Sequence, residues 1–146
     1  MGKPKVKKPH LTKTFIQQTL ENKKDSLSLL EDNYLLLSFR HLDRTQGHSL
    51  NYWEEQKMLA SAMETIANTC SSLMTDVFNS KKCTIYGGFP PKNKTSFTHP
   101  IHVPEDAKWA RVHVTGKQCI IGHIVRNTFY IVFLDGDHDF WDASKK

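Results

Sequence analysis

The sequence predicts an α+β fold, in which an antiparallel sheet of 4-5 strands carries a long helix and an N-terminal helix packed on one face. The last third of the chain, Trp109–Trp141, reads as three short β runs joined by two tight-turn signals. A central segment carries apolar residues at helical spacing. The order is helix, strand, long helix, strand, loop and three strands, which favours a mostly antiparallel sheet with helices on one side.

Residues 1–10 are predicted to form a disordered basic arm, and residues 11–146 a single α+β domain. Within residues 1–24, only Glu21 offsets the lysines, which are Lys3, Lys5, Lys7, Lys8, Lys13, Lys23 and Lys24. Such a block is typical of a solvated, mobile arm. It also attracts phosphate backbones or an acidic partner, so both interpretations stay open.

Two elements are predicted before the middle of the chain. A short amphipathic helix over residues 11–24 follows from apolar residues at helical spacing. The run Tyr34–Arg40 is nearly all apolar, which is typical of a strand covered on both faces. The polar residues 41–48 that follow contain Gly47 and are predicted to be a loop.

The strongest helix prediction covers residues 50–74. Ser49 or Asn51 can cap it, and Asn51 with Glu54 resembles a capping box. The stripe at three- and four-residue steps predicts core packing rather than a partner groove. Its members are Leu59, Met63, Ile66, Cys70 and Leu73.

A strand is predicted at Lys82–Tyr86, closed by two glycines, and a long irregular stretch follows over Phe89–Lys108. That stretch holds four of the six prolines. A loop of this length without internal structure is uncommon in a compact domain and is usually functional or mobile.

In the final meander, two-residue turns at Gly116-Lys117 and Asn127-Thr128 would pair Val112 with Ile121. Strand alternation then predicts a helix-facing side made of Val112, Val114, Cys119, Ile121, His123, Val125, Tyr130, Val132 and Leu134. The opposite side receives Arg111, His113, Thr115, Gln118, Ile120, Ile124, Arg126, Phe129, Ile131 and Phe133. A one-residue change in either turn would alter this partition.

Composition predicts a soluble, cytoplasmic protein without membrane contact. The N-terminus lacks the apolar core of a secretory signal, and no run approaches the roughly 18 apolar residues of a membrane span. The three cysteines form no C-x-x-C pair, which favours reduced thiols.

Several polar residues of the last third are candidates for chemistry. Arg111 and Arg126 can bind phosphate, or can be solvated residues at strand ends. His138 lies between two aspartates, which would raise its pKa and suit a general acid, or it is a turn histidine without a task. His123 falls on the predicted core face, which favours a buried structural residue.

No cofactor or metal is predicted. The aspartates from Asp135 onwards lack the glycine and glutamate of an EF-hand loop. His99-x-x-His102 lies in a proline-rich loop, and its spacing to other ligand types recommends no zinc site. The motifs of P-loop nucleotidases, serine hydrolases and zinc proteases are also missing from the sequence.

The segment Trp109–Trp141, with its two arginines and late histidine, resembles the C-terminal half of the RelE/ParE/YoeB superfamily of bacterial toxins. The phrase F-Y-I-V-F-L-D-G-D-H also resembles small open reading frames of bacterial mobile and phage-defence loci. The resemblance implies a toxin of a toxin–antitoxin or phage-defence system that acts as a metal-independent endoribonuclease, an mRNA interferase. Its implied partners are RNA, including ribosome-bound mRNA, and a cognate antitoxin or other partner protein.

The resemblance also implies roles for individual residues. Arg111 and Arg126 would bind phosphate, His138 would be the general acid, and His113 is the candidate base. Phe140 or Trp141 would stack on a base. We expect the nucleic-acid-binding set to be Lys3, Lys5, Lys7, Lys8, Lys92, Lys94 and Trp141. Three aspartates, Asp135, Asp137 and Asp139, depart from the family pattern, since carboxylates near a phosphate site repel RNA.

Two other functions stay open. The basic and aromatic face, with the basic arm, would also suit a non-catalytic accessory or inhibitor subunit that binds nucleic acid or protein. A metal-dependent hydrolase would use His99, His102 and the aspartates that follow the last strand.

Overall fold

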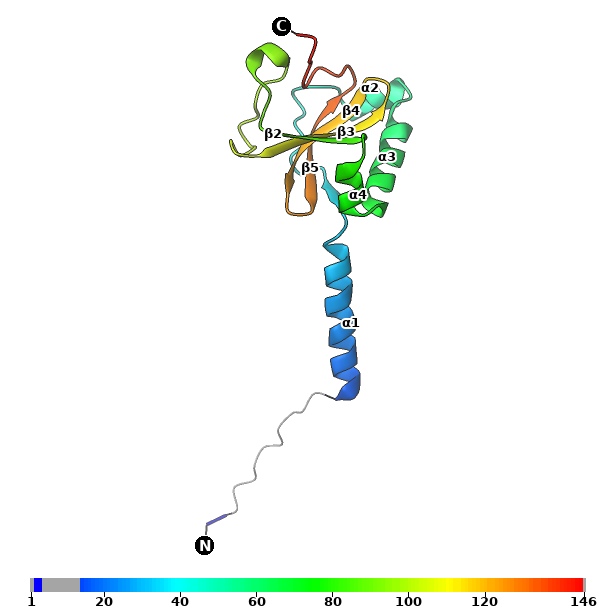
Figure 1. Ribbon diagram of the computed structural model, residues 1–146, viewed down its shortest axis with the longest axis vertical. Coiled ribbons are helices and arrows are strands. Elements are labelled where there is room, and N and C mark those ends of the chain that lie inside the picture. Colours follow the sequence, from blue (N-terminus) through cyan, green and yellow to red (C-terminus); the bar gives the residue numbers. More distant parts are fainter. Residues whose placement is uncertain (1, 4–13, 146) are drawn as a thin grey trace. The chain divides into compact units, whose positions relative to one another are not determined.

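The structure is a computed structural model (Figure 1) that describes residues 2–3 and 14–145. The chain divides into two compact units, residues 1–31 and 32–146. The first contains helix α1 (Phe15–Glu31), which covers part of the predicted 11–24 helix and extends beyond it. Phe15, Ile16 and Leu20 on this helix are 82%, 69% and 61% exposed. The predicted packing of the N-terminal helix on the sheet stays a prediction.

The second unit is an α+β domain around a five-stranded sheet with the order β1-β5-β4-β3-β2. The strands are β1 (Leu36–Ser38), β2 (Cys83–Gly87), β3 (Lys108–Thr115), β4 (Gln118–Val125) and β5 (Thr128–Asp135). All neighbours are antiparallel except β1 and β5, which are parallel. The predicted α+β class and mostly antiparallel sheet are thus confirmed, and the one parallel pair makes the sheet mixed.

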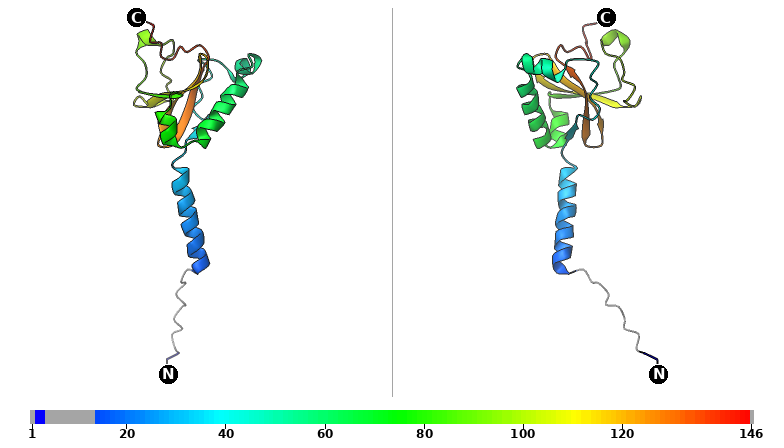
Figure 2. Two further views of the ribbon diagram at one scale, coloured as in Figure 1. Left: turned by 45° about the vertical axis from the view of Figure 1, so that its right-hand side comes forward. Right: turned by 180° about the vertical axis from the view of Figure 1, so that it is seen from behind.

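The two faces of the sheet are covered differently (Figure 2). One face packs on the helices α2 (Leu50–Glu55), α3 (Leu59–Ser71) and α4 (Met74–Asn79), with Trp53, Ala62 and Val77 buried against it. The other face lies under the loop between β2 and β3, with its short helix η1 (Lys92–Lys94), and under the C-terminal segment. Each face therefore has its own apolar core.

The predicted partition of the meander was wrong because the strands contain bulges. The Gly116-Lys117 turn is confirmed, with Thr115 opposite Gln118, but a bulge at Val114 makes Val112 face Ile120. Ile120 therefore joins Val112 on the helix side, and Cys119 and Ile121 lie on the opposite side with Trp109. The bulge in β3 shifts the pairing of β4 by one residue, which reverses the side predicted for the residues of β4, whereas Val112 and Val114 keep the helix side.

The second hairpin turn also differs from its prediction. Val125 pairs with Thr128, so the turn residues are Arg126 and Asn127 rather than Asn127 and Thr128. Arg126 adopts a positive φ of 57° there. Phe129 and Ile131 pack on the helix side, and His123 and Tyr130 are paired on the opposite side.

The predicted helix over residues 50–74 is broken into α2 and α3. Lys57 has a positive φ of 57°, and the Met58 N–H bonds back to the Trp53 carbonyl at 2.7 Å. The Met58 carbonyl accepts from the buried Gln118 side chain at 2.9 Å. The break turns α2 so that Trp53 is fully buried. Ser49 caps α2 by accepting from the Tyr52 N–H, as one of the two predicted caps.

The apolar stripe of α3 and the strand at residues 34–40 are less buried than predicted. Met63 and Leu73 are 48% and 43% exposed. β1 is a three-residue edge strand in which Leu36 is 55% exposed, while Leu35 just before it is buried. Edge strands are covered less well than central ones, so the prediction that residues 34–40 are covered on both faces was wrong for β1. Within residues 2–3 and 14–145, no helix is long and apolar enough to cross a membrane.

Candidate functional site

The face opposite the helices brings together two of the predicted catalytic residues. Arg111 on β3 and His138, three residues beyond the end of β5, meet with 2.5 Å between Arg111 Nη1 and His138 Nε2. His138 has a positive φ of 62°, which turns the chain back over the sheet at this point. Arginine nitrogens only donate, so His138 Nε2 accepts and its imidazole carries any neutral-state proton on Nδ1.

This tautomer bears on the predicted role of His138. While Nε2 accepts from Arg111, its lone pair is engaged and only the Nδ1–H group of the ring is left to donate; Nε2 can take a proton once the Arg111 guanidinium turns to another acceptor, such as a phosphate. His113 lies two residues along the same strand face, and its Nε2 donates to the Gly116 carbonyl at 2.7 Å. The other ring nitrogen of His113 is the one left for proton transfer.

Tyr86 completes what we call the Arg111 site, defined as Tyr86, Arg111 and His138. The Arg111 Cζ lies 5.9 Å from the centroid of the Tyr86 ring. Burial raises the pKa of the Tyr86 phenol, and the Arg111 charge partly offsets this effect. The phenol is therefore held protonated, as a proton donor requires. The sequence does not single out Tyr86. The pairing of β2 with β3, which places Tyr86 beside Arg111, depends on residues outside β2.

The C-terminal segment folds over the basic face, and Asp135 fixes it there. The buried Asp135 carboxylate accepts from the backbone N–H groups of Asp139 at 3.0 Å and Phe140 at 2.9 Å. Burial nevertheless raises the pKa of Asp135. The Asp137 Oδ2 atom lies 3.4 Å from His48 Nε2. These two aspartates therefore have structural partners, which reduces the charge conflict predicted for a phosphate site.

Other groups near Arg111 are buried thiols. Burial raises the pKa of Cys83 and of Cys119 to about 11, and the Arg111 charge only partly offsets it. Both thiols stay protonated near neutral pH, which argues against a nucleophilic cysteine here. Arg111 Nε is buried and lacks a hydrogen-bond partner within the described part of the chain.

The remaining predicted site residues are dispersed. Arg126 lies exposed in the β4–β5 turn, five residues along β4 from the partner of Arg111, which is about 16 Å at strand spacing. Lys92 is exposed, whereas Lys94 donates through Nζ to the Lys145 carbonyl. Trp141 stacks on Tyr86 with 4.9 Å between ring centroids. Lys3 is exposed, and Lys5, Lys7 and Lys8 lie outside the described residues.

A second polar group that sequence analysis missed is the histidine cluster, made of His41, His102, His123 and Tyr130. His41 Nδ1 lies 3.0 Å from His123 Nε2, and the His41 ring stacks on Tyr130. His102 Nε2 donates to the His41 carbonyl at 2.7 Å. The cluster joins two loops to the sheet, and no local sequence pattern predicts that these residues lie together.

His123 is the buried centre of that cluster. Burial, and after it the charges of its neighbours His41, His102 and His99, together lower the pKa of His123 to about 4. Burial also lowers the pKa of His41. Near neutral pH both rings are therefore uncharged, which fits the structural role predicted for His123 but not its predicted place on the helix side. Among the described side chains, no group of three or more His, Cys, Asp and Glu is arranged to hold a metal ion.

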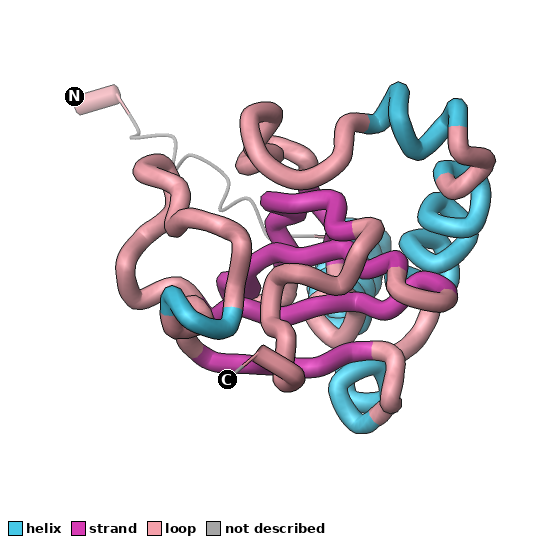
Figure 3. The backbone as a smooth tube through the Cα atoms, turned by 90° about the horizontal axis from the view of Figure 1, so that it is seen from above, coloured by secondary structure: helices cyan, strands magenta, loops and turns pink. Residues whose placement is uncertain are grey.

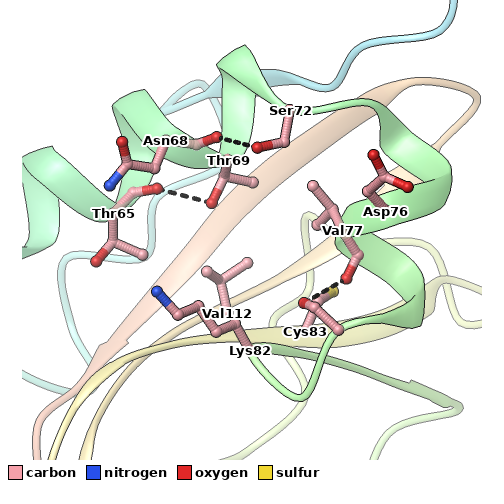
Figure 4. Close-up of a pocket in the computed structure, with 10 residues that line it drawn as sticks. Thr65, Asn68, Thr69, Ser72, Asp76, Val77, Lys82, Cys83 and Val112 are labelled. Carbon is pink, nitrogen blue, oxygen red and sulfur yellow. Dashed lines mark hydrogen bonds between the residues drawn. The ribbon is translucent and has the colours of Figure 1, made fainter.

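A small polar cavity of about 180 Å³ lies between α3, α4 and β2 (Figure 4). Its hydroxyl groups donate to carbonyls of their own chain segments at 2.7 to 2.9 Å; they belong to Thr65, Thr69, Ser72 and Ser80. The hydroxyl protons are thus used in these hydrogen bonds, and only the oxygen lone pairs could still accept a hydrogen bond from a ligand. Lys82 also lines the cavity, and the engaged hydroxyl groups make its wall part of the packing between α3, α4 and β2.

Comparison with family models, curated proteins and solved structures found no match to this chain.

Proposed function

We propose that this chain is an RNA-directed toxin of the cytoplasm, from a toxin–antitoxin or phage-defence system, that cleaves RNA without a metal. The contact between Arg111 and His138 carries the proposal, because it sets a phosphate-binding cation beside an imidazole whose Nε2 becomes free to take a proton when Arg111 turns to the phosphate. The resemblance of residues 109–141 to RelE-like toxins supports the choice of RNA.

The proposed chemistry is transfer of a phosphodiester to the neighbouring ribose hydroxyl. His138 takes the proton of the 2′-hydroxyl, whose oxygen forms a bond to phosphorus as the bond to the 5′-oxygen breaks. The Tyr86 phenol gives its proton to the leaving 5′-oxygen, and a 2′,3′-cyclic phosphate results. Arg111 stabilises the charge that develops on the phosphate, an electrostatic effect that is often the largest single contribution.

The first experiment is inducible expression in a bacterial host, followed by mapping of RNA ends. Wild type is expected to arrest growth, and His138→Ala and Arg111→Ala to relieve arrest with cleavage reduced at least about 100-fold. Arg126→Ala is the matched control, because it removes the same charge from the turn far from His138. Arrest by all variants, with no new RNA ends, would contradict the catalytic proposal.

The second candidate is a non-catalytic subunit that binds nucleic acid or protein. The observation that favours it is the cover over the Arg111 site, where Trp141 stacks on Tyr86 and Arg111 is only partly exposed. For this function, His138→Ala should leave the binding affinity unchanged. Removal of exposed lysines should lower the affinity and reduce its dependence on salt concentration.

A further inference from the structure

The loop between β2 and β3 forms a cavity on the side of the sheet away from the helices. Its volume is about 470 Å³, within the range of small-molecule sites. All of its lining comes from one segment, residues 89–99. A cavity made by a single loop needs outside support if it is to keep its shape.

That support comes from two segments. Figure 3 shows the backbone of the loop, with its short helix, beside the end of the C-terminal segment. The side chain of Gln46 clamps Thr98, accepting from its N–H at 2.7 Å and donating to its carbonyl at 2.9 Å. On the other side, the C-terminal segment bonds to η1, where the Asp142 N–H donates to the Lys94 carbonyl at 2.8 Å. The loop is thus held before any ligand arrives, which lowers the entropy cost of binding.

The chemistry of the lining suits a planar ring that bears an anion. Phe89 and Phe97 supply aromatic surface, and Lys92 is an exposed cation on the lining. Thr95 and Ser96 add hydroxyl groups. Aromatic side chains stack on nucleobases of any sequence, and lysine binds phosphate as a point charge.

His99 adds one unsatisfied acceptor to the same lining. Its Nδ1 lies 3.0 Å from the Pro100 carbonyl, and since a carbonyl only accepts, this nitrogen carries the proton. Nε2 therefore carries a lone pair, and it is buried without a partner in the described residues. Because Nε2 is closed off from solvent, the His99 ring contributes to the wall of the cavity rather than a hydrogen bond to the base.

We infer that this cavity binds one nucleotide, with the base against Phe89 and Phe97 and the phosphate at Lys92. The inference deepens the proposed RNA-directed function and rests on it for the choice of ligand. The C-terminal segment that bonds to η1 also carries His138, so the cavity and the Arg111 site share a structural support. The nucleotide held here would belong to the RNA strand that reaches Arg111.

Calorimetric titration of the full chain with adenosine 5′-monophosphate, adenosine and inorganic phosphate tests this directly. Adenosine monophosphate is expected to bind with a Kd of about 10 µM to 1 mM. Ser96→Trp, which fills the cavity from an exposed position, should weaken binding at least about 10-fold. Lys92→Ala should weaken the monophosphate about 3- to 10-fold and leave adenosine unchanged, with Lys117→Ala as the matched control.

Three outcomes would overturn the inference: no saturable binding of the monophosphate up to about 10 mM, equal binding by Ser96→Trp in a folded state, or binding of phosphate as tight as that of the nucleotide. The Lys92→Ala comparison removes one exposed side chain of the lining and adds no bulk, so it remains a test if Ser96→Trp fails to fold. Binding of the nucleotide by a protein that does not cleave RNA would support the inference about the cavity and contradict the proposed catalysis. Cleavage without nucleotide binding would overturn the cavity alone.

Discussion

The buried imidazole of His123 makes a specific prediction about stability and pH. The unfolded chain binds a proton at this residue below its ordinary pKa of 6.5, whereas the folded protein does so only near a pKa of about 4. Between these values the unfolded state holds more protons, so stability is lost as pH falls from about 6.5 to about 4. The contribution is on the order of 3 kcal/mol.

Urea unfolding at several pH values, for wild type and His123→Phe, measures this contribution. Phenylalanine keeps an aromatic ring beside Tyr130 but cannot take a proton, so the pH dependence should flatten by on the order of 3 kcal/mol. The groups that face His123 are His41, His99, His102 and Tyr130, and all remain in the variant. Equal pH dependence in the two proteins would refute a neutral His123.

At the scale of elements, the close approach of β4 and β5 depends on Gly122. A Cβ built there would collide with the Tyr130 carbonyl oxygen and would press on the Phe129 ring, next to the β5 bulge. Gly122→Ala should therefore destabilise the protein by about 3 kcal/mol, since backbone must move. The measurement is a denaturant midpoint.

Gly88→Ala serves as its control, because Gly88 has open space around its Cβ position. That substitution should change the free energy of unfolding by no more than about 0.5 kcal/mol. A Gly122→Ala protein as stable as wild type would mean that the strands separate here more easily than the structure indicates.

The sequence predicts elements better than it predicts their relations. The three final strands, β2 and the Ser49 cap follow from local signals: alternation, turn residues and a hydroxyl before a helix. The bulges at Val114 and Val132 and the break at Lys57 depend on packing between distant segments, such as the Gln118 bond to Met58. A local pattern cannot contain them.

The candidate site follows the same division. Arg111 and His138 stand out in the sequence by residue type, and the structure brings them together through the turn that Asp135 fixes. Tyr86 and the histidine cluster lie on other elements and meet the site only through sheet register and loop placement. No local sequence motif marks these side chains, and only the fold shows which groups they contact.

At the scale of the whole chain, the positive charge is unevenly placed. Residues 1–31 hold seven lysines and three acids, so they carry four of the five net positive charges. The remaining residues, with the Arg111 site and the loop cavity, are close to neutral. Attraction to RNA should therefore come mainly from the N-terminal unit, and selection and chemistry from the domain of residues 32–146.

Two variants test this division of labour: a chain of residues 32–146, and a full-length chain in which Lys3, Lys5, Lys7 and Lys8 are replaced by Gln. Residues 32–146 form their own compact unit, so the shortened chain should unfold at an unchanged denaturant midpoint. On single-stranded RNA, each neutralised phosphate contributes about −0.7 to the slope of log affinity against log salt. The shortened chain should lose about 3 to 5 from that slope, and the four-Gln chain about 3. Filter binding over a range of salt concentrations measures both slopes. An unchanged slope in the shortened chain would place the RNA contacts in the domain itself. A loss only in the shortened chain would assign them to the other lysines of residues 1–31, which are Lys13, Lys23 and Lys24.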